Sequence, residues 1–238
     1  MKAVILAAGR GTRLEPLTLE MPKCMVKVRG VPLIDRLIAR VREAGIEDII
    51  VVSGHLHEVL SEHLADSGCC LVYNERYHDW GNFYSLLVAR EAVGDDGYVK
   101  LDGDVVMDGA VLPKLLATPG DAVLALDGRD GLGAEEMKAR LHGDLVVELN
   151  KRMDPSVAFG EYIGVEKISA SLAPRAFDQL AKMIGLGETD EYYERGYERM
   201  MQAGVAFGFV DVGECTWTEI DDAADLKRAE SMAAAGRV

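Results

Sequence analysis

The chain begins with MKAVILAAGRGTRLEPLTLEMPK (residues 1–23), and this stretch decides how the fold is interpreted. An apolar run over residues 3–6 passes directly into Gly9 and Gly11, which is typical of a strand that turns tightly into a phosphate-binding loop. Several kinds of nucleotide-binding fold begin in this way, so the residues after the glycines have to distinguish them.

Two familiar phosphate-binding motifs do not match these residues. The dinucleotide-binding motif of oxidoreductases needs a third small residue and an acidic residue at the end of the second strand, where Leu14 and Ser53 stand here. The P-loop motif needs Gly-Lys-Ser/Thr at a fixed spacing, which is absent. The sequence therefore predicts a long glycine-rich loop whose backbone N–H groups, with Arg13 and Lys23, hold a polyphosphate.

Apolar runs alternate with helical periods, which predicts a mostly parallel sheet covered by helices on both faces. We expect strands over residues 2–6, 48–52, 69–73, 97–101 and 121–126, and helices over 31–44, 56–65, 81–93 and 109–117. After residue 127 we expect two short strands around a turn at 142–144, a strand over 161–169, helices at 170–184, 189–203 and 221–235, and a strand at 205–211. The predicted fold is one α/β domain over 1–238, a Rossmann-like doubly wound sheet with a small sheet extension over the ligand.

Composition excludes some classes of partner. A net charge of −14 argues against nucleic acid, although residues 1–42 contain nine Lys/Arg against three acidic residues. That basic segment fits a polyphosphate ligand or a merely solvated face equally well. Four cysteines without a C-x-x-C pair predict a reduced, cytoplasmic chain. We interpret the start as a first strand, not a signal peptide, and no apolar run approaches the ~18–20 residues that span a bilayer.

The N-terminal residues resemble the nucleotidyltransferase family of the sugar-1-phosphate type. Its pattern L-A-A-G-x-G-T/S-R-L…P-K is matched at residues 6–14 and 22–23, and the continuation CMVKVRGVPLIDRLI (24–38) is also similar. The resemblance implies that Arg13 and Lys23 are catalytic and stabilise the departing pyrophosphate. It also implies a set of nucleotide-binding residues in this loop: Leu6, Ala8, Gly9, Gly11 and Thr12.

Two acidic segments are expected to face that loop. The strand at 97–101 runs into Asp102 and Asp104, and the carboxyl ends of parallel strands form the ligand crevice of an open α/β sheet. A second segment, WTEID, ends at Asp221. The resemblance implies that Asp104 and Asp221 hold Mg²⁺, which needs few carboxylates, while Asp102 contacts the nucleotide. An alternative role for Asp221 is to cap the last helix.

The middle of the chain narrows the resemblance to one branch. NERYHDWGNFYSLLVARE (74–91), EEMK (135–138), ELNK (148–151) and GEYIGVEKIS (160–169) resemble cytidylyltransferases that act on phosphocholine or 2-aminoethylphosphonate. The resemblance implies that Asn82 and Ser85 read the pyrimidine and that Gly81 leaves room for it. Residues 1–127 would then form the nucleotide-binding half and residues 128–238 the acceptor-binding half.

Side chains for the acceptor also follow from this resemblance. The candidates for its phosphate or phosphonate are Lys138 and Lys151; those for an amine are Glu161, Asp190 and Tyr192; the aromatic faces for a quaternary ammonium are Trp80, Tyr162 and Trp217. The plainer alternative is that the lysines are solvated and the aromatic rings are structural. His55 and His57 lack a third ligand and do not predict a zinc site.

The expected activity is Mg²⁺-dependent transfer of CMP from CTP to a small phosphorylated alcohol or phosphonate, with release of pyrophosphate. A sugar-1-phosphate nucleotidylyltransferase stays open as an alternative, as does a non-catalytic nucleotide-binding sensor. A sensor would be expected to lose one of the four charged residues implied in catalysis and metal binding, and all four are present. The C-terminal segment DLKRAESMAAAG (225–236), read as an exposed apolar helix, leaves a homodimer open.

Overall fold

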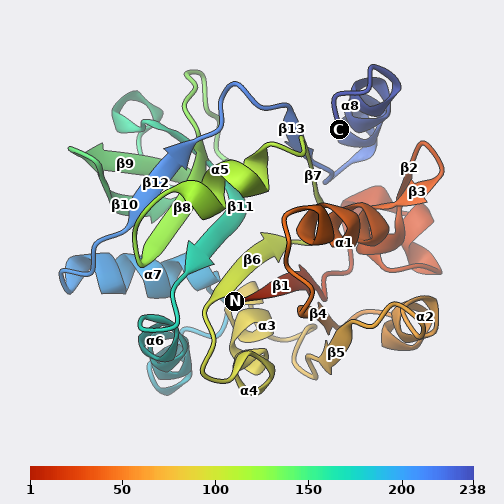
Figure 1. Ribbon diagram of the computed structural model, residues 1–238, viewed down its shortest axis with the longest axis horizontal. Helices are drawn as coiled ribbons and strands as arrows, with labels where there is room; N and C mark the ends of the chain where they lie inside the picture. The colour runs from red at the N-terminus through yellow and green to blue at the C-terminus, as the bar shows by residue number, and fades with distance from the viewer.

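A nine-stranded sheet forms the centre of the protein, whose computed structural model describes residues 1–238 (Figure 1). Neighbouring strands lie in the order β10-β9-β11-β6-β1-β4-β5, and β8 and β12 continue beyond β11. The strands of this sheet are β1 (Lys2–Ala7), β4 (Ile49–Ser53), β5 (Cys70–Tyr73), β6 (Tyr98–Asp102), β8 (Ala122–Asp127), β9 (Lys138–His142), β10 (Leu145–Asn150), β11 (Gly160–Ile168) and β12 (Gly208–Asp211).

Most of these strands point in one direction. β5, β4, β1 and β6 pair in parallel, and β11 runs antiparallel between β6 and β8. Ile5 lies opposite Val51 on one side and Leu101 on the other. β1 and β4 are buried almost throughout, as expected of parallel strands covered on both faces. The prediction of a mixed α/β fold with a mostly parallel central sheet is confirmed.

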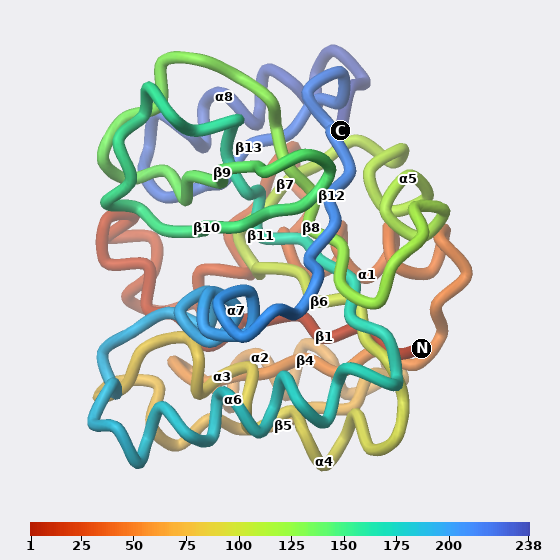
Figure 2. Tube along the Cα trace, turned by 90° about the vertical axis from the view of Figure 1, so that its left-hand side faces the viewer, coloured from red at the N-terminus to blue at the C-terminus, as the bar shows by residue number.

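Helices cover both faces because successive residues of a strand point to opposite sides. Val4 and Val52 pack with α3, α4, α6 and α7, whereas Ile5 and Val51 pack with α1, α2 and α5. Figure 2 shows α6 and α7 next to each other, below β9, β10 and β11. The helices are α1 (Leu33–Glu43), α2 (His57–His63), α3 (Asn82–Val88), α4 (Arg90–Val93), α5 (Val111–Ala117), α6 (Ala173–Gly185), α7 (Tyr193–Gln202) and α8 (Ala223–Ala234).

The boundaries differ from the expected ones at a few places. The helix expected from residue 31 begins at Leu33, because β3 (Val31–Pro32) first pairs with β2 (Lys27–Val28). The helix expected over 81–93 is divided into α3 and α4, and the one expected from 189 begins at Tyr193. Four short strands were not predicted: β2 and β3, and the pair β7 (Val105–Met107) and β13 (Trp217–Glu219), which also lies outside the main sheet. Each is only two or three residues long, too short for a clear alternating pattern.

The expected sheet extension is formed by β9 and β10. β8 pairs along one edge of β11, while the other edge pairs first with β9 at Gly160 and then with β6 from Val165. Between these pairings the register is irregular, and Gly164 adopts φ +73°. A Cβ atom at Gly164 would lie 2.4 Å from Asp102 Oδ2, so the glycine permits the end of β6 to approach β11 closely.

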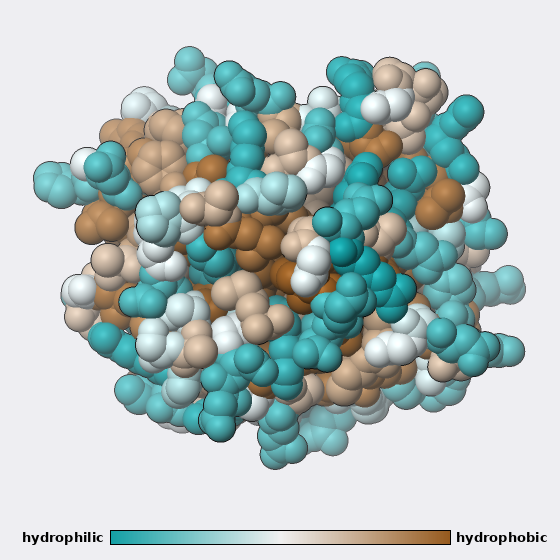
Figure 3. All heavy atoms as spheres, viewed as in Figure 1, coloured by the Kyte–Doolittle hydropathy of each residue, from teal (hydrophilic) through white to brown (hydrophobic).

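Helix α8 does not present the apolar face that we expected. Its Ala229 is buried against a small cluster that includes Val28 and Ile220, and Met232 is also buried. The packing of α8 within the chain therefore removes the observation on which the homodimer rested. The face in Figure 3 is covered largely by hydrophilic side chains, with apolar atoms visible near its centre. None of the helices has the length and apolarity needed to span a bilayer.

Candidate active site

A cavity of about 350 Å³ opens at the carboxyl ends of β1 and β6. It brings together residues from both ends of the chain, including most of those predicted from the sequence. The predicted residues that line it are Leu6, Ala8, Gly9, Gly11, Thr12, Arg13, Lys23, Asn82, Ser85, Asp102, Asp104, Lys151, Glu161, Tyr162, Tyr192 and Asp221. The predicted residues that do not line it, described below, are Trp80, Gly81, Lys138, Asp190 and Trp217.

The glycine-rich loop is held in a conformation that only glycine adopts without strain. Gly11 has φ +65°, and a Cβ atom there would lie 2.9 Å from Lys23 Cβ. The carbonyl oxygen of Gly11 accepts hydrogen bonds from Leu14 N–H (2.9 Å) and Thr18 Oγ1 (2.8 Å). Nothing lies within 4 Å of a Cβ atom at Gly9, so this part of the loop faces open space. The loop thus leaves room for a ligand while it carries Lys23 against its inner side.

The Lys23 ammonium lies between the two carboxylates expected to hold metal. Its Nζ is 2.6 Å from Asp104 Oδ2 and 2.6 Å from Asp221 Oδ1, and Arg13 reaches the other oxygen of Asp221 at 2.9 Å. Burial by itself would lower the pKa of Lys23, but Asp104 and Asp221 raise it above its usual value. The net effect keeps the ammonium charged. Despite burial, Lys23 lowers the pKa of Asp221.

This geometry fits a divalent cation. The two carboxylates already converge on one positive group, which shows that their oxygens are aimed at a common point. No cluster of three or more His, Cys, Asp or Glu side chains forms a complete cage. Mg²⁺ is commonly held by one or two carboxylates together with substrate phosphates, so a pair of carboxylates beside a phosphate loop is sufficient.

The start of α8 leaves Asp221 free for this site. Asp222, rather than Asp221, is the N-cap residue, and its side chain accepts hydrogen bonds from the backbone N–H groups of Ala224 and Asp225. The alternative reading of Asp221 as the cap is therefore wrong. Ile220 N–H donates to the Asp104 carbonyl oxygen at 3.0 Å, which carries Asp221 next to Asp104.

The residues predicted to read the base lie in the cavity wall, but their surroundings differ from our expectation. Asn82 Oδ1 accepts the backbone N–H of Tyr193 at 3.0 Å, and Ser85 Oγ accepts from Asn74 Nδ2 at 2.9 Å. Gly81 does not make room for a base. A Cβ atom there would lie 2.0 Å from the carbonyl oxygen of Glu191, so the neighbouring backbone requires this glycine.

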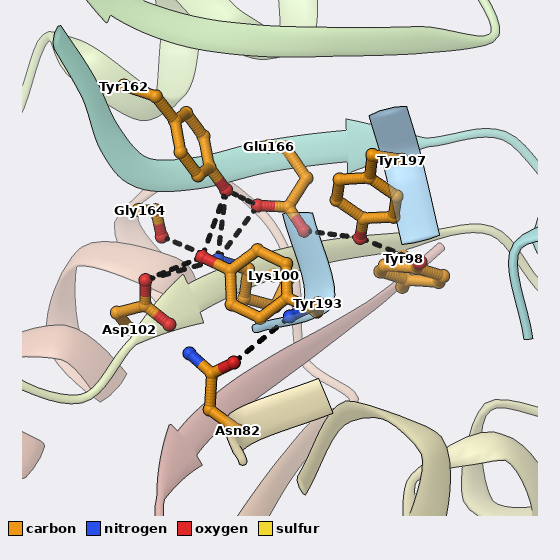
Figure 4. Close-up of polar contacts among 9 residues, drawn as sticks. All are labelled: Asn82, Tyr98, Lys100, Asp102, Tyr162, Gly164, Glu166, Tyr193 and Tyr197. Atoms are coloured by element: carbon orange, nitrogen blue, oxygen red, sulfur yellow. Dashed lines mark hydrogen bonds and ion pairs between the residues drawn. The ribbon is translucent and has the colours of Figure 1, made fainter. Parts of the chain in front are cut away.

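Lys100 is fully buried at the back of the cavity, in the middle of β6 (Figure 4). Its Nζ lies 3.0 Å from Glu166 Oε2, 2.9 Å from Tyr162 Oη, 3.1 Å from the Gly164 carbonyl oxygen and 3.3 Å from Asp102 Oδ2. Burial lowers the pKa of Lys100, but Asp102 and Glu166 outweigh this and raise it above its usual value. The charge of Lys100 therefore balances carboxylates that would otherwise be costly to bury.

Tyr193 connects this cluster to residues that line the cavity. Its hydroxyl donates to Asp102 Oδ2 at 2.7 Å and also contacts Lys100, while its backbone N–H donates to Asn82. Deeper in the core, Tyr197 Oη donates to Glu166 Oε1 at 2.7 Å. Helix α7 in the second half of the chain thus fixes side chains of the first half.

The residues predicted to bind an acceptor include a buried acid that is paired with a cation. Glu161 forms an ion pair with Arg129, and burial raises the pKa of Glu161 to about 7 although Arg129 opposes the shift. Lys151 Nζ lies 5.1 Å from the centre of the Tyr192 ring, and Lys151 is near enough to Asp221 to contribute to lowering its pKa. Lys151 therefore lies near both Tyr192 and Asp221.

Lys138 and Asp190 are not placed where we predicted them. Lys138 is buried, and its Nζ donates to the carbonyl oxygens of Glu136 (3.1 Å) and Lys151 (2.7 Å), so it holds the backbone of the sheet extension. Asp190 is exposed and does not line the cavity. Its backbone packs against Gly81 instead.

Protein cations already lie against the aromatic rings considered for a quaternary ammonium. Arg76 lies 5.6 Å from the centre of the Trp80 ring, Arg129 lies 5.6 Å from that of Trp217, and neither tryptophan lines the cavity. Tyr162 does line it, but Lys100 Nζ lies 5.2 Å from its ring centre.

Sequence reasoning missed several residues that line this cavity or belong to the buried cluster around Lys100. A lysine within the apolar run YVKL and a glutamate within YIGVEKI were visible signals of a buried pair, because an isolated charge is seldom placed in a central strand. Glu219 gave no such signal; burial and the nearby Asp104 and Asp102 raise its pKa well above the usual value. The missed residues are Lys100, Glu166, Tyr193, Glu194 and Glu219.

The fold and the site together define a protein of the nucleotidyltransferase class. The chain belongs to the family of MobA-like NTP transferase domains, whose model matches residues 3–187. It is 43% identical over 102 residues, 43% of this chain, to choline-phosphate cytidylyltransferase of Streptococcus pneumoniae. It is 28% identical over 97% of its length to CMP-5′-(3-aminopropyl)phosphonate synthase of Streptomyces rubellomurinus.

These matches span less than half of each curated relative, 44% of the first and 38% of the second. Among solved structures, CTP:phosphocholine cytidylyltransferase of Streptococcus pneumoniae superposes with a TM-score of 0.78 at 26% identity, over 98% of both chains. The fold is therefore shared along the whole chain, including the sheet extension and the C-terminal segment that carries Asp221.

Proposed function

We propose that this protein is a Mg²⁺-dependent cytidylyltransferase that transfers CMP from CTP to a small phosphorylated alcohol or phosphonate. The observation that carries the proposal is the convergence of Lys23, Asp104 and Asp221 beside the glycine-rich loop. Relatives that act on phosphocholine and on an aminopropylphosphonate support the choice of CTP and of a small acceptor.

The reaction needs little covalent chemistry from the protein. A phosphate or phosphonate oxygen of the acceptor is already anionic near pH 7, so no general base has to create the nucleophile. This oxygen attacks the α-phosphorus of CTP, the bond from that phosphorus to the bridging oxygen breaks, and pyrophosphate leaves. Catalysis then depends on alignment and on neutralising charge, as in other phosphoryl-type transfers.

The chain's own residues supply that alignment and charge. Backbone N–H groups of the loop at Gly9 and Gly11 hold the triphosphate, and Arg13 and Lys23 neutralise the leaving pyrophosphate. A Mg²⁺ held by Asp104 and Asp221 would polarise the phosphate oxygens and offset their charge. For Lys23 to reach the phosphates it has to leave the carboxylates that it contacts in the free protein.

The remaining residues orient the two substrates. Asn82 and Ser85 line the wall where the base would lie, and their hydrogen bonds to Tyr193 and Asn74 fix their direction. Lys151 is the lysine best placed for the acceptor's anionic group, because Lys138 is already bound to carbonyl oxygens.

The test is pyrophosphate release with Mg²⁺, crossing CTP, UTP, ATP and GTP with phosphocholine, phosphoethanolamine, 2-aminoethylphosphonate, inositol phosphate and sugar 1-phosphates. The proposal predicts a signal that is selective for CTP and for a small acceptor, and its loss in Asp221→Asn. Turnover only with sugar 1-phosphates would instead establish a sugar nucleotidylyltransferase. Nucleotide binding without pyrophosphate release from any pair would favour the sensor.

A further inference from the structure

Glu194 is a buried carboxyl that the reaction described above does not use. It stands in the first turn of α7, is only 6% exposed, and its Oε2 is buried without a hydrogen-bond partner. An acidic residue in the first turn of a helix is ordinary when solvent surrounds it. A buried carboxylate oxygen without a hydrogen-bond donor is unusual, because no contact offsets the free energy that it costs to remove the charge from water.

Neighbouring cations do not satisfy this carboxyl. The two arginines of α7 that follow it, Arg195 and Arg199, pair with Glu198 and Glu188 respectively. Lys100 is close enough to favour the ionised form of Glu194, but its Nζ is bonded to other groups. Burial dominates and raises the pKa of Glu194 to about 8. The carboxyl therefore lacks a full counter-charge within the protein.

Glu194 lies where two cavities meet. It lines the cavity at the ends of β1 and β6, which we call the nucleotide cavity, and also a neighbouring cavity of about 450 Å³. Met137, Lys151 and Tyr192 line both cavities as well. Lys151, the lysine assigned to the acceptor's anionic group, thus shares a wall with Glu194. An acceptor whose phosphorus end is held by Lys151 would therefore lie at the same junction as Glu194.

The lining of the nucleotide cavity contains more acidic than basic side chains. Its lining contains seven acidic side chains against three basic ones, although it has to receive two phosphorylated substrates. Lys23, Arg13 and Arg129 already pair with Asp104, Asp221 and Glu161. One bound divalent ion at Asp104 and Asp221 leaves Glu194 without a partner.

We infer that Glu194 binds the primary ammonium of the acceptor, so that the preferred substrate is an aminoalkyl phosphonate or phosphate and not a trimethylammonium compound. The inference rests on the proposed function. A primary ammonium donates N–H groups to a carboxylate, whereas a quaternary ammonium has none and is recognised mainly by aromatic faces. Two tyrosine rings line the cavity, and each already has a lysine within 5.2 Å of its centre.

The experiment compares acceptors that differ only in methylation of nitrogen: phosphoethanolamine against phosphocholine, and 2-aminoethylphosphonate against its N-trimethyl derivative. With CTP and Mg²⁺, we expect kcat/KM to be at least about tenfold higher for the primary amines. Glu194→Gln should raise KM for the amine acceptors by about 10- to 100-fold, the worth of a charge-assisted hydrogen bond, and leave KM for CTP unchanged. Asp178→Asn, which removes an exposed acidic charge from the neighbouring helix α6, is the matched control and should behave as the wild type.

Binding can be measured without turnover, which separates this inference from the proposed function. Phosphoethanolamine and phosphocholine are titrated calorimetrically into the wild-type protein and into Glu194→Gln. Tighter binding of phosphoethanolamine that is lost in Glu194→Gln supports the inference even if no pyrophosphate is released. The inference is overturned if kcat/KM for phosphocholine equals or exceeds that for phosphoethanolamine. It is also overturned if Glu194→Gln loses as much turnover with ethyl phosphate, which has no nitrogen, as with phosphoethanolamine.

Discussion

Replacing Lys23 by Met should make the free protein bind a divalent cation that the wild type binds weakly. In the structure the ammonium lies 2.6 Å from one oxygen of Asp104 and 2.6 Å from one of Asp221, with only 13% of the lysine side chain exposed. A metal ion that takes these oxygens has to displace the ammonium. Methionine keeps the length and the apolar stem of lysine and removes only the competing charge.

The magnitude follows from the two contacts. A hydrogen bond to a charged group is worth about 1.5–3 kcal/mol, so displacing two of them costs at least about 3 kcal/mol. Since about 1.4 kcal/mol corresponds to a factor of ten, the affinity of the nucleotide-free protein for the ion should rise by about 100-fold in Lys23→Met. Nucleotide phosphates offer Lys23 new partners, so the wild type would accept the ion readily only together with CTP.

The assay is direct titration with Mn²⁺, followed by electron paramagnetic resonance or calorimetry, with and without CTP. Lys27→Met, an exposed lysine on β2, is the control and should titrate as the wild type does. If Lys23→Met and the wild type bind Mn²⁺ equally in the absence of nucleotide, Lys23 does not compete for the metal position and the reasoning fails. Activity alone cannot decide this point, because Lys23 is also expected to stabilise the leaving group.

Three further predictions concern residues that support the site. Lys100→Met should lower the melting temperature by on the order of 10 °C, measured in a thermal scan. It leaves buried carboxylates without a counter-charge, which lowers the free energy of unfolding by about 3–5 kcal/mol. The pKa of Glu161 rises from 4.5 to about 7 on folding, so its contribution to stability is full below pH 4.5 and disappears as the pH rises to about 7. Arg129→Met should deepen this decline, seen as a larger drop in the urea midpoint between pH 5 and pH 7.5; an unchanged drop would contradict the pairing. Gly164→Ala should destabilise the fold by about 1–2 kcal/mol from the left-handed backbone alone and, by displacing Asp102, raise KM for CTP.

The parts of the site that follow from local sequence were predicted well. The strand into Gly9 and Gly11, and the strand into Asp102 and Asp104, are continuous segments whose shape depends on neighbouring residues. The same holds for the long strands and helices of the first half. These features could be placed at one edge of a sheet from the rule for parallel strands alone.

The residues that were misplaced depend on contacts between distant segments. Lys138 and Asp190 were assigned from the family resemblance, but the direction of a side chain at the end of a strand or in a loop depends on what packs beside it. The buried Lys100 cluster joins β6, β11 and α7, which no local pattern relates. Gly81 shows the same limit, since the backbone that requires it lies about 110 residues later in the chain.

The bridge from Lys23 to Asp104 and Asp221 also has a consequence for biosynthesis. Asp104 and Asp221 lie 81 and 198 residues after Lys23 along the chain. A ribosome-bound chain can form the glycine-rich loop and the first strands early, but it lacks one of the two carboxylates until residue 221 has been added. A nascent chain that has not reached residue 221 would therefore expose the glycine-rich loop without the pair of carboxylates that this loop faces.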